Sequence, residues 1–373
     1  MPATQPDSPA APPMPPSPLS RNPGLWRGSD LQDSEDWIFR FPPESLTEIR
    51  AALAAVQARG LNAPAFGKAD FPLPKFSTVL AHMLEELENG RGFFLMRGFP
   101  VTEFTEAECE IIFWGLGQHL GIPLSQNAEG HELGHVRNLG LDINKTNVRA
   151  YQTTAELIFH NDQSDVIMLM CLKAARSGGQ SRLVSVTAIQ NEIQRRRPDL
   201  LEELYKPFYI DRRGERGRED EGDEPFYAMP VLSYHKGLVT VRYIRGYIES
   251  AQRFPEVPRL TPRQIEALDL FDAIANEPGM ALAFQMEPGD FQLANNFCVL
   301  HSRTNFEDWP ELKDRRHLLR LWVSAPNSRE LPPCFETRFG TCEGGKKRGG
   351  IPPRAEAGVA VKDQVQEFRL EKV

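Results

Sequence analysis

Two side chains that can bind a metal stand two positions apart, directly after the apolar residues 157–159. These are His160 and Asp162. In an extended strand, residues at positions i and i+2 point to the same face, so this imidazole and this carboxylate can share one metal ion. A third ligand is required, and His301, at the end of a predicted strand over residues 297–301, is the candidate. Two histidines and one carboxylate on one face of an octahedron are the usual site of non-haem Fe(II) oxygenases.

Two arginines accompany another predicted strand, over residues 317–324. Alternation places Arg316 and Arg320 on one face, and the opposite face is equally apolar, so a solvated edge does not explain them. A guanidinium binds a carboxylate through two parallel hydrogen bonds. Two of the open positions on such a metal can take a 2-oxo acid through its carboxylate and keto oxygens. If that acid carries a second, distal carboxylate, Arg316 is suited to bind it. The structural alternative for these arginines is an ion pair with a carboxylate such as Glu307 or Asp308.

A second pattern, His131-Glu132-Leu133-Gly134-His135, matches that of zinc hydrolases. In those enzymes two histidines one helical turn apart bind zinc and the glutamate acts as the base, so the pattern needs a helix. Glycines at positions 130, 134 and 140 interrupt the segment, and a glycine inside a helix costs about 1 kcal/mol relative to alanine. We expect a polar surface loop here, and keep a zinc hydrolase using His131, Glu132 and His135 as an alternative function.

Three helices are predicted from capping boxes, in which a Ser or Thr bonds a free amide of the first turn and a Glu or Gln three residues on bonds back. The boxes begin at Ser45, Thr105 and Thr261. A glycine-rich run at residues 115–121 resembles a nucleotide loop, but such a loop opens a helix after a strand. This run ends a predicted helix, and we interpret its glycines as the end of that helix.

Most other patterned segments favour short strands separated by Gly, Pro and Asn turns. The predicted strands cover residues 92–97, 157–162, 166–172, 238–243, 280–286, 297–301 and 317–324. The fold class is mainly β with flanking helices, as a sandwich or small barrel.

The composition is that of a soluble globular protein, with 40% hydrophobic and 25% charged residues and a net charge of −8 among 373 residues. This balance predicts no nucleic-acid partner, and the absence of a long apolar run or a signal peptide predicts a cytoplasmic protein with no membrane partner. The five cysteines are scattered, without a C-x-x-C pair, so we expect reduced thiols.

Three stretches predict loops or tails around one domain. The proline-rich residues 1–34 are expected to form a disordered tail, since they carry almost no large apolar residues. Residues 35–339 form the single domain, in which the dense charges of residues 211–224 predict a loop insertion. Residues 340–373 are expected to form a loosely attached C-terminal tail.

Five motifs in register resemble the taurine dioxygenase-like (TauD/TfdA) family of Fe(II)/2-oxoglutarate-dependent oxygenases. The motifs are His160-Asn161-Asp162, Ser177-Gly178-Gly179-Gln180-Ser181, Pro288-Gly289-Asp290-Phe291-Gln292, Asn295-Asn296 through His301-Ser302-Arg303, and Arg315-Arg316-His317-Leu318-Leu319-Arg320-Leu321-Trp322. Their order and spacing agree over roughly residues 92–324.

The resemblance implies a double-stranded β-helix (jelly roll) and a role for each matching residue. His160, Asp162 and His301 match the catalytic metal ligands for Fe(II). Ser181 matches a hydroxyl that helps to hold a carboxylate of the co-substrate 2-oxoglutarate, and Arg316 matches the arginine on its distal carboxylate. Arg320 matches a second arginine, which lies near the iron-proximal end of 2-oxoglutarate or binds an anionic group of the substrate.

The reaction implied by the family is oxidative decarboxylation of 2-oxoglutarate to succinate and CO2, coupled to hydroxylation, desaturation or cyclisation of a small organic substrate by O2. The resemblance does not identify that substrate, and a homo-oligomer stays open. A non-catalytic jelly-roll binding protein is the second alternative, beside the zinc hydrolase.

Overall fold

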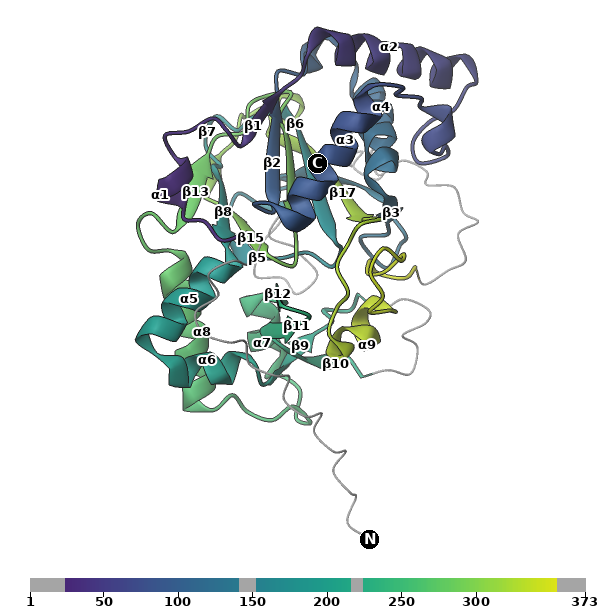
Figure 1. Cartoon of the computed structure of the whole chain (residues 1–373). Coiled ribbons are helices and arrows are strands. Elements are labelled where there is room, and N and C mark those ends of the chain that lie inside the picture. Colours follow the sequence, from purple (N-terminus) through teal and green to yellow (C-terminus); the bar gives the residue numbers. More distant parts are fainter. Residues whose placement is uncertain (1–23, 141–151, 216–223, 354–373) are drawn as a thin grey trace, which may run out of the picture.

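The computed structural model of the chain describes residues 24–140, 152–215 and 224–353. At its centre two β-sheets lie face to face, and helices pack around them (Figure 1). In the described part of the chain the larger sheet has seven strands, in the order β1-β2-β14-β6-β17-β3, with β4 also paired to β17. These strands are β1 (Ile38–Arg40), β2 (Phe93–Arg97), β3 (Ile122–Leu124), β4 (Leu133–Arg137), β6 (Val166–Lys173), β14 (Phe291–Asn295) and β17 (His317–Ser324).

The smaller sheet is antiparallel, in the order β13-β8-β15-β5. Its strands are β5 (Leu157–His160), β8 (Ser181–Ser185), β13 (Ala281–Phe284) and β15 (Val299–Arg303). The remaining described strands pair in twos: β9 (Pro207–Asp211) with β10 (Phe226–Pro230), β11 (Leu232–His235) with β12 (Leu238–Val241), and β7 (Ser177–Gly178) with β16 (Phe306–Glu307). The structure is thus a mixture of sheets with helices, as the strand pattern predicts.

The α-helices of the described residues flank these sheets. They are α1 (Gly28–Leu31), α2 (Pro43–Ala58), α3 (Phe76–Asn89), α4 (Glu106–Leu120), α5 (Val186–Arg196), α6 (Pro198–Leu204), α7 (Arg245–Ala251), α8 (Pro262–Ala275) and α9 (Glu336–Phe339). Short 3-10 helices lie at Lys68–Asp70, Val101–Glu103, Leu312–Asp314 and Pro333–Phe335.

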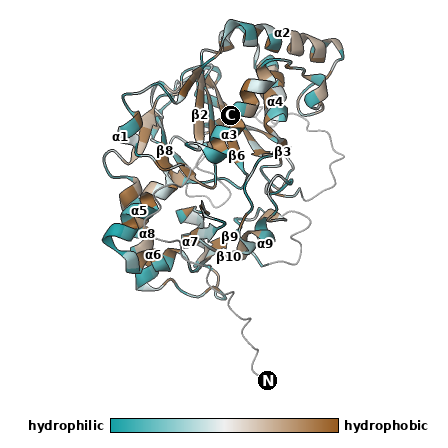
Figure 2. Ribbon diagram, in the orientation of Figure 1, coloured by the Kyte–Doolittle hydropathy of each residue, from teal (hydrophilic) through white to brown (hydrophobic). Residues whose placement is uncertain are grey.

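Strand β17 shows how the larger sheet separates two cores. Leu319, Leu321 and Val323 point outward and are buried with helices α2, α3 and α4. Leu318 and Trp322 point inward and are buried in a cluster that also contains residues of the smaller sheet. Both faces of the strand are therefore apolar, and the central strands in Figure 2 carry many brown, hydrophobic residues.

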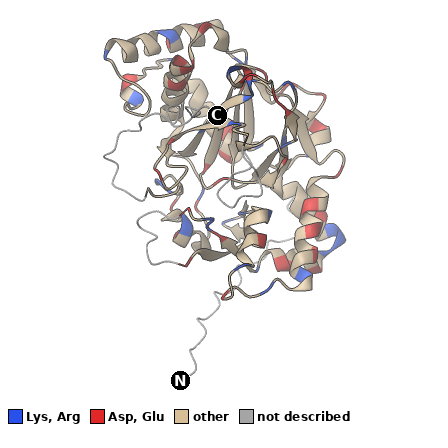
Figure 3. Cartoon of the chain, turned by 180° about the vertical axis from the view of Figure 1, so that it is seen from behind, with Lys and Arg blue, Asp and Glu red and all other residues tan. Residues whose placement is uncertain are grey.

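Helices α5, α6 and α8 pack together beside the smaller sheet, and their buried residues share a third cluster with strands β9 to β12. Their exposed faces carry both signs of charge, at the lower right of Figure 3. There Arg196 pairs with Glu192 and Glu277. The pair of Arg196 with Glu277, whose side chains are 33% and 32% exposed, contributes little to stability, because water screens it.

Two of the predicted capping boxes are confirmed. The hydroxyl of Thr105 accepts the N–H of Glu108 at the start of α4, and the corresponding bond links Thr261 to Gln264 in α8. The prediction at Ser45 is wrong by three residues, because the N-cap of α2 is Pro42 and the helix begins at Pro43. Proline at a first helical position has its φ already set for the helix. The glycines of the 115–121 run lie in the last turns of α4 and at its C-cap, as expected.

The folded chain begins earlier than the predicted boundary at residue 34. Trp26 is buried in the core between the sheets, and its indole N–H donates to the carbonyl of Arg91 (2.8 Å). The N–H of Gly28 donates to the carbonyl of Met280 (2.9 Å), and a Cβ on Gly28 would lie 2.0 Å from the carbonyl oxygen of Ala281. One buried tryptophan and one close-packed glycine thus hold a stretch that composition assigns to the tail. Residues 1–23 of that tail lie outside the described residues.

The predicted C-terminal tail is also shorter than expected, because residues 340–353 pack onto the fold. Arg348 is fully buried and its Nε donates to Asp165 Oδ1 (2.7 Å). The N–H of Gly350 donates to the carbonyl of Gln163 (2.7 Å). A Cβ on Gly349, which has a φ of +77°, would lie 2.7 Å from that same carbonyl oxygen. The glycines that suggest a loose tail are what allow this close approach.

The predicted loop at residues 211–224 is described only at its ends. Asp211 ends β9 and is buried, accepting hydrogen bonds from Ser250 and Arg253. Residues 216–223 and 354–373 lie outside the described residues. Within the described ranges, no helix is long and apolar enough to span a membrane.

Candidate active site

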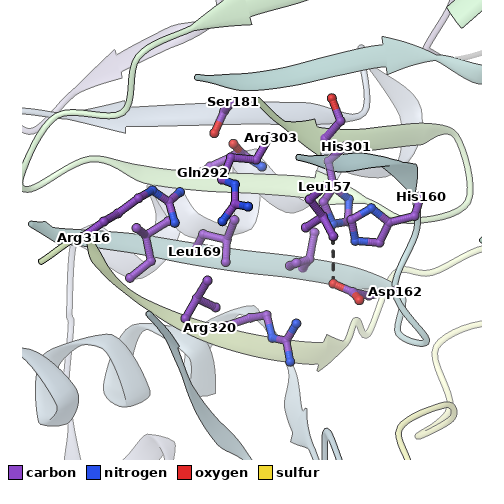
Figure 4. Close-up of a pocket in the computed structure, with 14 residues that line it drawn as sticks. Leu157, His160, Asp162, Leu169, Ser181, Gln292, His301, Arg303, Arg316 and Arg320 are labelled. Carbon is purple, nitrogen blue, oxygen red and sulfur yellow. Dashed lines mark ion pairs between the residues drawn. The ribbon is translucent and has the colours of Figure 1, made fainter. Parts of the chain in front are cut away.

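A pocket opens between the two sheets (Figure 4). It brings together all six residues selected from the sequence, which lie in strands β5, β8, β15 and β17 or within two residues of their ends. Its lining residues are Val136, Leu157, His160, Asp162, Ile167, Leu169, Ser181, Gln292, His301, Ser302, Arg303, Arg316, Leu318 and Arg320.

One end of the pocket holds a cluster of two histidines and a carboxylate, which we call the pocket cluster: His160, Asp162 and His301. One ligand atom from each lies within 4.8 Å of the others. The His301 Nε2 is 3.6 Å from Asp162 Oδ2, and the two imidazole centroids are 4.3 Å apart. His160 pairs with His301 across β5 and β15, and Asp162 follows the end of β5. This cluster could hold one metal ion.

The protonation of these groups suits metal binding. His160 Nδ1 bonds the carbonyl of Ile158 (2.8 Å) and must be the donor, which leaves the lone pair of Nε2 available. Burial, with the neighbouring His301, lowers the pKa of His160 to about 4. Burial alone would raise the pKa of Asp162, but the neighbouring His301 imidazole and the charge of Arg320 bring it below its usual value. A neutral imidazole and an ionised carboxylate are the forms that bind metals.

The backbone around Asp162 is fixed from behind the pocket. The side-chain amide of Asn161 donates to the carbonyls of Val241 (3.1 Å) and Asn296 (2.7 Å). Asn296 Oδ1 accepts the N–H of Asp162 (3.0 Å), and Arg242 donates to the carbonyl of Asn161 (3.1 Å). These bonds give a physical reason for the asparagines in the sequence motifs, since they hold the turn that aims Asp162.

The other end of the pocket is cationic. Arg316 is buried there, and burial lowers the pKa of its guanidinium. Its backbone N–H, rather than its guanidinium, donates to Asp308 (2.7 Å). No carboxylate of the described residues forms an ion pair with the guanidinium, so the predicted alternative of a pair with Glu307 or Asp308 is not found. The guanidinium lies near the ring of Phe306, with 5.4 Å from Cζ to the centroid.

Arg320 lies between the two ends, on the same side of β17 as Arg316. Its Nε donates to Gln126 Oε1 (2.6 Å), and its Cζ is 5.3 Å from the ring of Trp322. The amide of Gln126 also donates to the carbonyls of Glu132 and Arg320. Gln126 therefore orients Arg320, a role that the sequence did not reveal.

Sequence reasoning also missed Gln292 and Arg303 as pocket residues. Gln292 is a buried polar residue in the apolar strand β14, and its Oε1 has no hydrogen-bond partner in the described chain. Arg303 stands two positions after His301, so strand alternation could have placed it on the same face. Burial, with the nearby charge of Arg316, lowers the pKa of Arg303 to about 9.

The zinc-hydrolase alternative fails on local structure. Residues 133–137 form strand β4, where residues four apart do not make one helical turn, and the predicted surface loop is likewise replaced by this strand. His131 Nδ1 bonds the amide of Asn127 (2.9 Å), whereas His135 contacts His317 of β17. The two histidines of the pattern thus have separate partners. His135 instead joins Glu106 and His317 in a second cluster, which we call the outer cluster.

Comparison with known proteins identifies the family of the chain. Residues 57–322 match the family described as "Taurine catabolism dioxygenase TauD, TfdA family". The FR-33289 synthase of Streptomyces rubellomurinus is 31% identical over 322 residues, covering 84% of this chain and 92% of the relative. The taurine hydroxylase-like protein SAT17 of Stachybotrys chartarum is 29% identical over 307 residues, covering 79% of this chain and 77% of the relative.

Solved structures share the fold at low identity. An asparagine oxygenase in complex with Fe(II), 3-hydroxyasparagine and succinate superposes with a TM-score of 0.58 at 16% identity, covering 77% of this chain and 93% of the other. The non-haem iron oxygenase OrfP, in complex with Fe and alpha-ketoglutaric acid, gives 0.54 at 14% identity, covering 77% and 94%. From the match over residues 57–322 and the coverage of these relatives, the chain belongs to the TauD/TfdA family of dioxygenases.

Proposed function

We propose that this protein couples the oxidative decarboxylation of 2-oxoglutarate to the hydroxylation, desaturation or cyclisation of a small organic substrate. One observation carries the proposal: the pocket cluster and the buried guanidinium of Arg316 face the same pocket. As a TauD/TfdA family member, the protein is a 2-oxoglutarate-dependent non-haem iron dioxygenase. The proposal concerns which residues bind iron, which bind 2-oxoglutarate, and which type of product is formed.

The pocket cluster fits Fe(II). His160 and His301 supply imidazole nitrogens, and Asp162 supplies a carboxylate whose buried Oδ2 has no hydrogen-bond partner among the described residues. An orphaned buried carboxylate oxygen is costly unless something binds it. Two histidines and a carboxylate are the ligand set of non-haem Fe(II) sites with open positions. We therefore assign His160, Asp162 and His301 as the iron ligands.

The cationic end fits the distal carboxylate of 2-oxoglutarate. Arg316 can fork onto that carboxylate, and Ser181, buried on β8, can donate its hydroxyl to a carboxylate of the same molecule. Arg320, lying nearer the pocket cluster, is assigned to the iron-proximal carboxylate or to an anionic group of the substrate. When bound, iron and 2-oxoglutarate supply the activation of O2 and the release of succinate and CO2.

The apolar residues of the pocket limit the access of water to the bound groups. Leu157 comes from the smaller sheet, and Leu169 and Leu318 come from the larger sheet. Exclusion of water strengthens the electrostatic grip of the arginines on a carboxylate. The two facing sheets support the further proposal that the domain is a double-stranded β-helix.

A spectroscopic titration tests the proposal. Under argon, adding 2-oxoglutarate to the Fe(II)-loaded protein should produce the weak visible charge-transfer band of a chelated 2-oxo acid, and oxygen should discharge it with release of succinate. Asp162→Ala should give no band, whereas Glu106→Ala, in the outer cluster, should give the band of the wild type. A protein that binds iron but never consumes 2-oxoglutarate, with any substrate tried, would instead be a binding protein.

The fate of oxygen distinguishes the products. With isotopically labelled O2 and a substrate found by screening for succinate release, hydroxylation places label in the organic product. Desaturation or cyclisation removes two hydrogen atoms and leaves that product unlabelled.

A further inference from the structure

Arg303 is a second buried guanidinium at the Arg316 end of the pocket. It stands at the end of β15, opposite Ser181 of β8, and only 5% of its surface is exposed. Its Cζ lies 4.5 Å from the centroid of the Phe306 ring, and the Cζ of Arg316 lies 5.4 Å from the same centroid. The two guanidiniums thus lie against one aromatic ring. Figure 4 shows both arginines among the residues that line the pocket.

The guanidinium of Arg303 is held by the chain just before β5. Its two terminal nitrogens donate to the carbonyls of Thr153 and Ala155. Its Nε is buried without a hydrogen-bond partner among the described residues. The side chain is therefore fixed in place by its two terminal nitrogens. Its positive charge acts on any ligand bound at this end of the pocket.

The charges at the Arg316 end of the pocket are not balanced by the described part of the protein. Among residues 24–140, 152–215 and 224–353, Asp308 is the one carboxylate that acts electrostatically on both arginines. Two buried guanidiniums beside one carboxylate leave a net positive charge, and a buried charge without a counter-charge is costly. A ligand that brings a second carboxylate to this end would balance it.

We infer that Arg303 makes the Arg316 end of the pocket selective for dicarboxylate 2-oxo acids, by adding a second fixed positive charge and by packing against Phe306, which also contacts Arg316. This inference rests on the proposed function, because it assigns Arg303 to the co-substrate of that site. Arg303 is here a positioning residue: it acts on the ligand through Phe306, Arg316 and the local field.

The test compares two 2-oxo acids that chelate iron in the same way. Under argon, 2-oxoglutarate and pyruvate are titrated into the Fe(II)-loaded protein, and the ratio of their dissociation constants is taken from the charge-transfer band. Arg303→Gln and Arg303→Met should weaken 2-oxoglutarate at least tenfold and leave pyruvate within about twofold. Arg303→Lys, which keeps the charge, should recover most of the ratio. Arg182→Met is the matched control, because Arg182 lies on neighbouring β8 but does not line the pocket.

The possible outcomes separate the inference from the proposed function. A purely structural role of Arg303 would weaken both acids together, or only lower the melting temperature, and would overturn the inference. If Arg316→Ala weakens 2-oxoglutarate and neither neutral Arg303 variant changes the ratio, the inference fails while the proposed function stands. If Arg316→Ala also has no effect, the assignment of this end of the pocket fails. Should one neutral variant not fold, the other and the Lys variant still give the ratio.

Discussion

The described part of the chain contains two clusters of two histidines and a carboxylate, on opposite sides of the larger sheet. The pocket cluster lies between the sheets, and the outer cluster lies between β4, β17 and α4. In each, one ligand atom from every member lies within 4.8 Å of the others. Their members are His160, Asp162 and His301, and Glu106, His135 and His317. By residue type and proximity alone, the two clusters are equivalent.

The hydrogen bonds of the histidines separate the two clusters. In the outer cluster, His317 Nδ1 accepts from Arg137 (2.5 Å), and its Nε2 lies 2.9 Å from His135 Nδ1. Both ring nitrogens of His317 are therefore engaged, and burial with the charge of Arg137 lowers its pKa to about 2. In the pocket cluster, His160 engages only Nδ1, with a backbone carbonyl.

A metal site therefore requires imidazole nitrogens whose lone pairs are not engaged in hydrogen bonds, as well as the right residue types. The guanidinium of Arg137 takes the place that a metal cation would occupy beside His317 Nδ1. We interpret the outer cluster as a hydrogen-bonded link between α4 and the sheet, through Glu106 and Glu110.

The largest expected effect comes from the support behind the pocket cluster. Asp165, three residues after Asp162, pairs with Arg348 in a fully buried ion pair. Arg348→Met should lower the free energy of unfolding by about 3–5 kcal/mol, because it leaves a buried carboxylate without its partner. Urea denaturation measures this. Arg40→Met, at an exposed pair with Glu35, is the control and should cost about 0–1 kcal/mol; equal losses would show that the buried pair has no special weight.

The next effect concerns the cationic end of the pocket. Arg316→Ala should weaken 2-oxoglutarate binding by about 2–5 kcal/mol, the cost of truncating one partner of a buried charge pair. Arg316→Lys should recover only part, since an ammonium cannot fork onto a carboxylate. Pyruvate, which lacks the distal carboxylate, should bind wild type and Arg316→Ala alike in anaerobic titrations. Arg320→Ala should instead change pyruvate binding or substrate coupling, and identical behaviour of the two variants would show that their separate roles are misassigned.

A smaller effect isolates the outer cluster. Arg137→Met removes the donor to His317 Nδ1 and should destabilise the fold by about 1.5–3 kcal/mol, the range for a hydrogen bond that involves a charged group. Thermal unfolding and iron content are measured together. The iron content should not change, and a parallel loss of iron would mean that the outer cluster supports the metal.

The smallest effect is a pH dependence at Glu110. Burial, with the charge of Glu106, raises the pKa of Glu110 from 4.5 to about 7. Ionisation is thus harder in the folded state, so the stability that the protonated group contributes is complete below about pH 4.5 and declines as the pH rises to about 7. Glu110→Gln should remove this decline and stabilise the protein more at pH 8 than at pH 5, as urea unfolding at both values would show. If the free energy of unfolding of Glu110→Gln declines with pH as steeply as that of the wild type, another group causes the dependence.

Much of the candidate site is readable from the sequence because it is local. Alternation in a strand relates Arg316 to Arg320, and a two-residue spacing relates His160 to Asp162. His301 lies beside this pair because β15 pairs with β5. The family motifs imply that His301 belongs to the site, but the periodicity of the sequence does not. The β4 strand was missed because His135 reads as part of a hydrolase pattern until its pairing with β17 is known.

The rest depends on contacts between distant residues. Trp26 and Arg348 lie in stretches whose composition is that of tails, and each is held by contacts that include a residue far along the chain, Arg91 for Trp26 and Asp165 for Arg348. The composition of a stretch does not reveal such contacts, so it predicts tails that are too long. The role of Gln126 likewise depends on its contact with Arg320, which is 194 residues away in the sequence.

Iron content after alanine substitution tests the comparison most directly. Wild type and four variants, His160→Ala, His301→Ala, His135→Ala and His317→Ala, are purified anaerobically, loaded with Fe(II), and assayed for bound iron and for folding by circular dichroism. We predict about one iron per chain in the wild type and in the folded outer-cluster variants, and none in the folded pocket-cluster variants. Loss of iron from folded His135→Ala or His317→Ala, with iron retained in His160→Ala, would contradict the account.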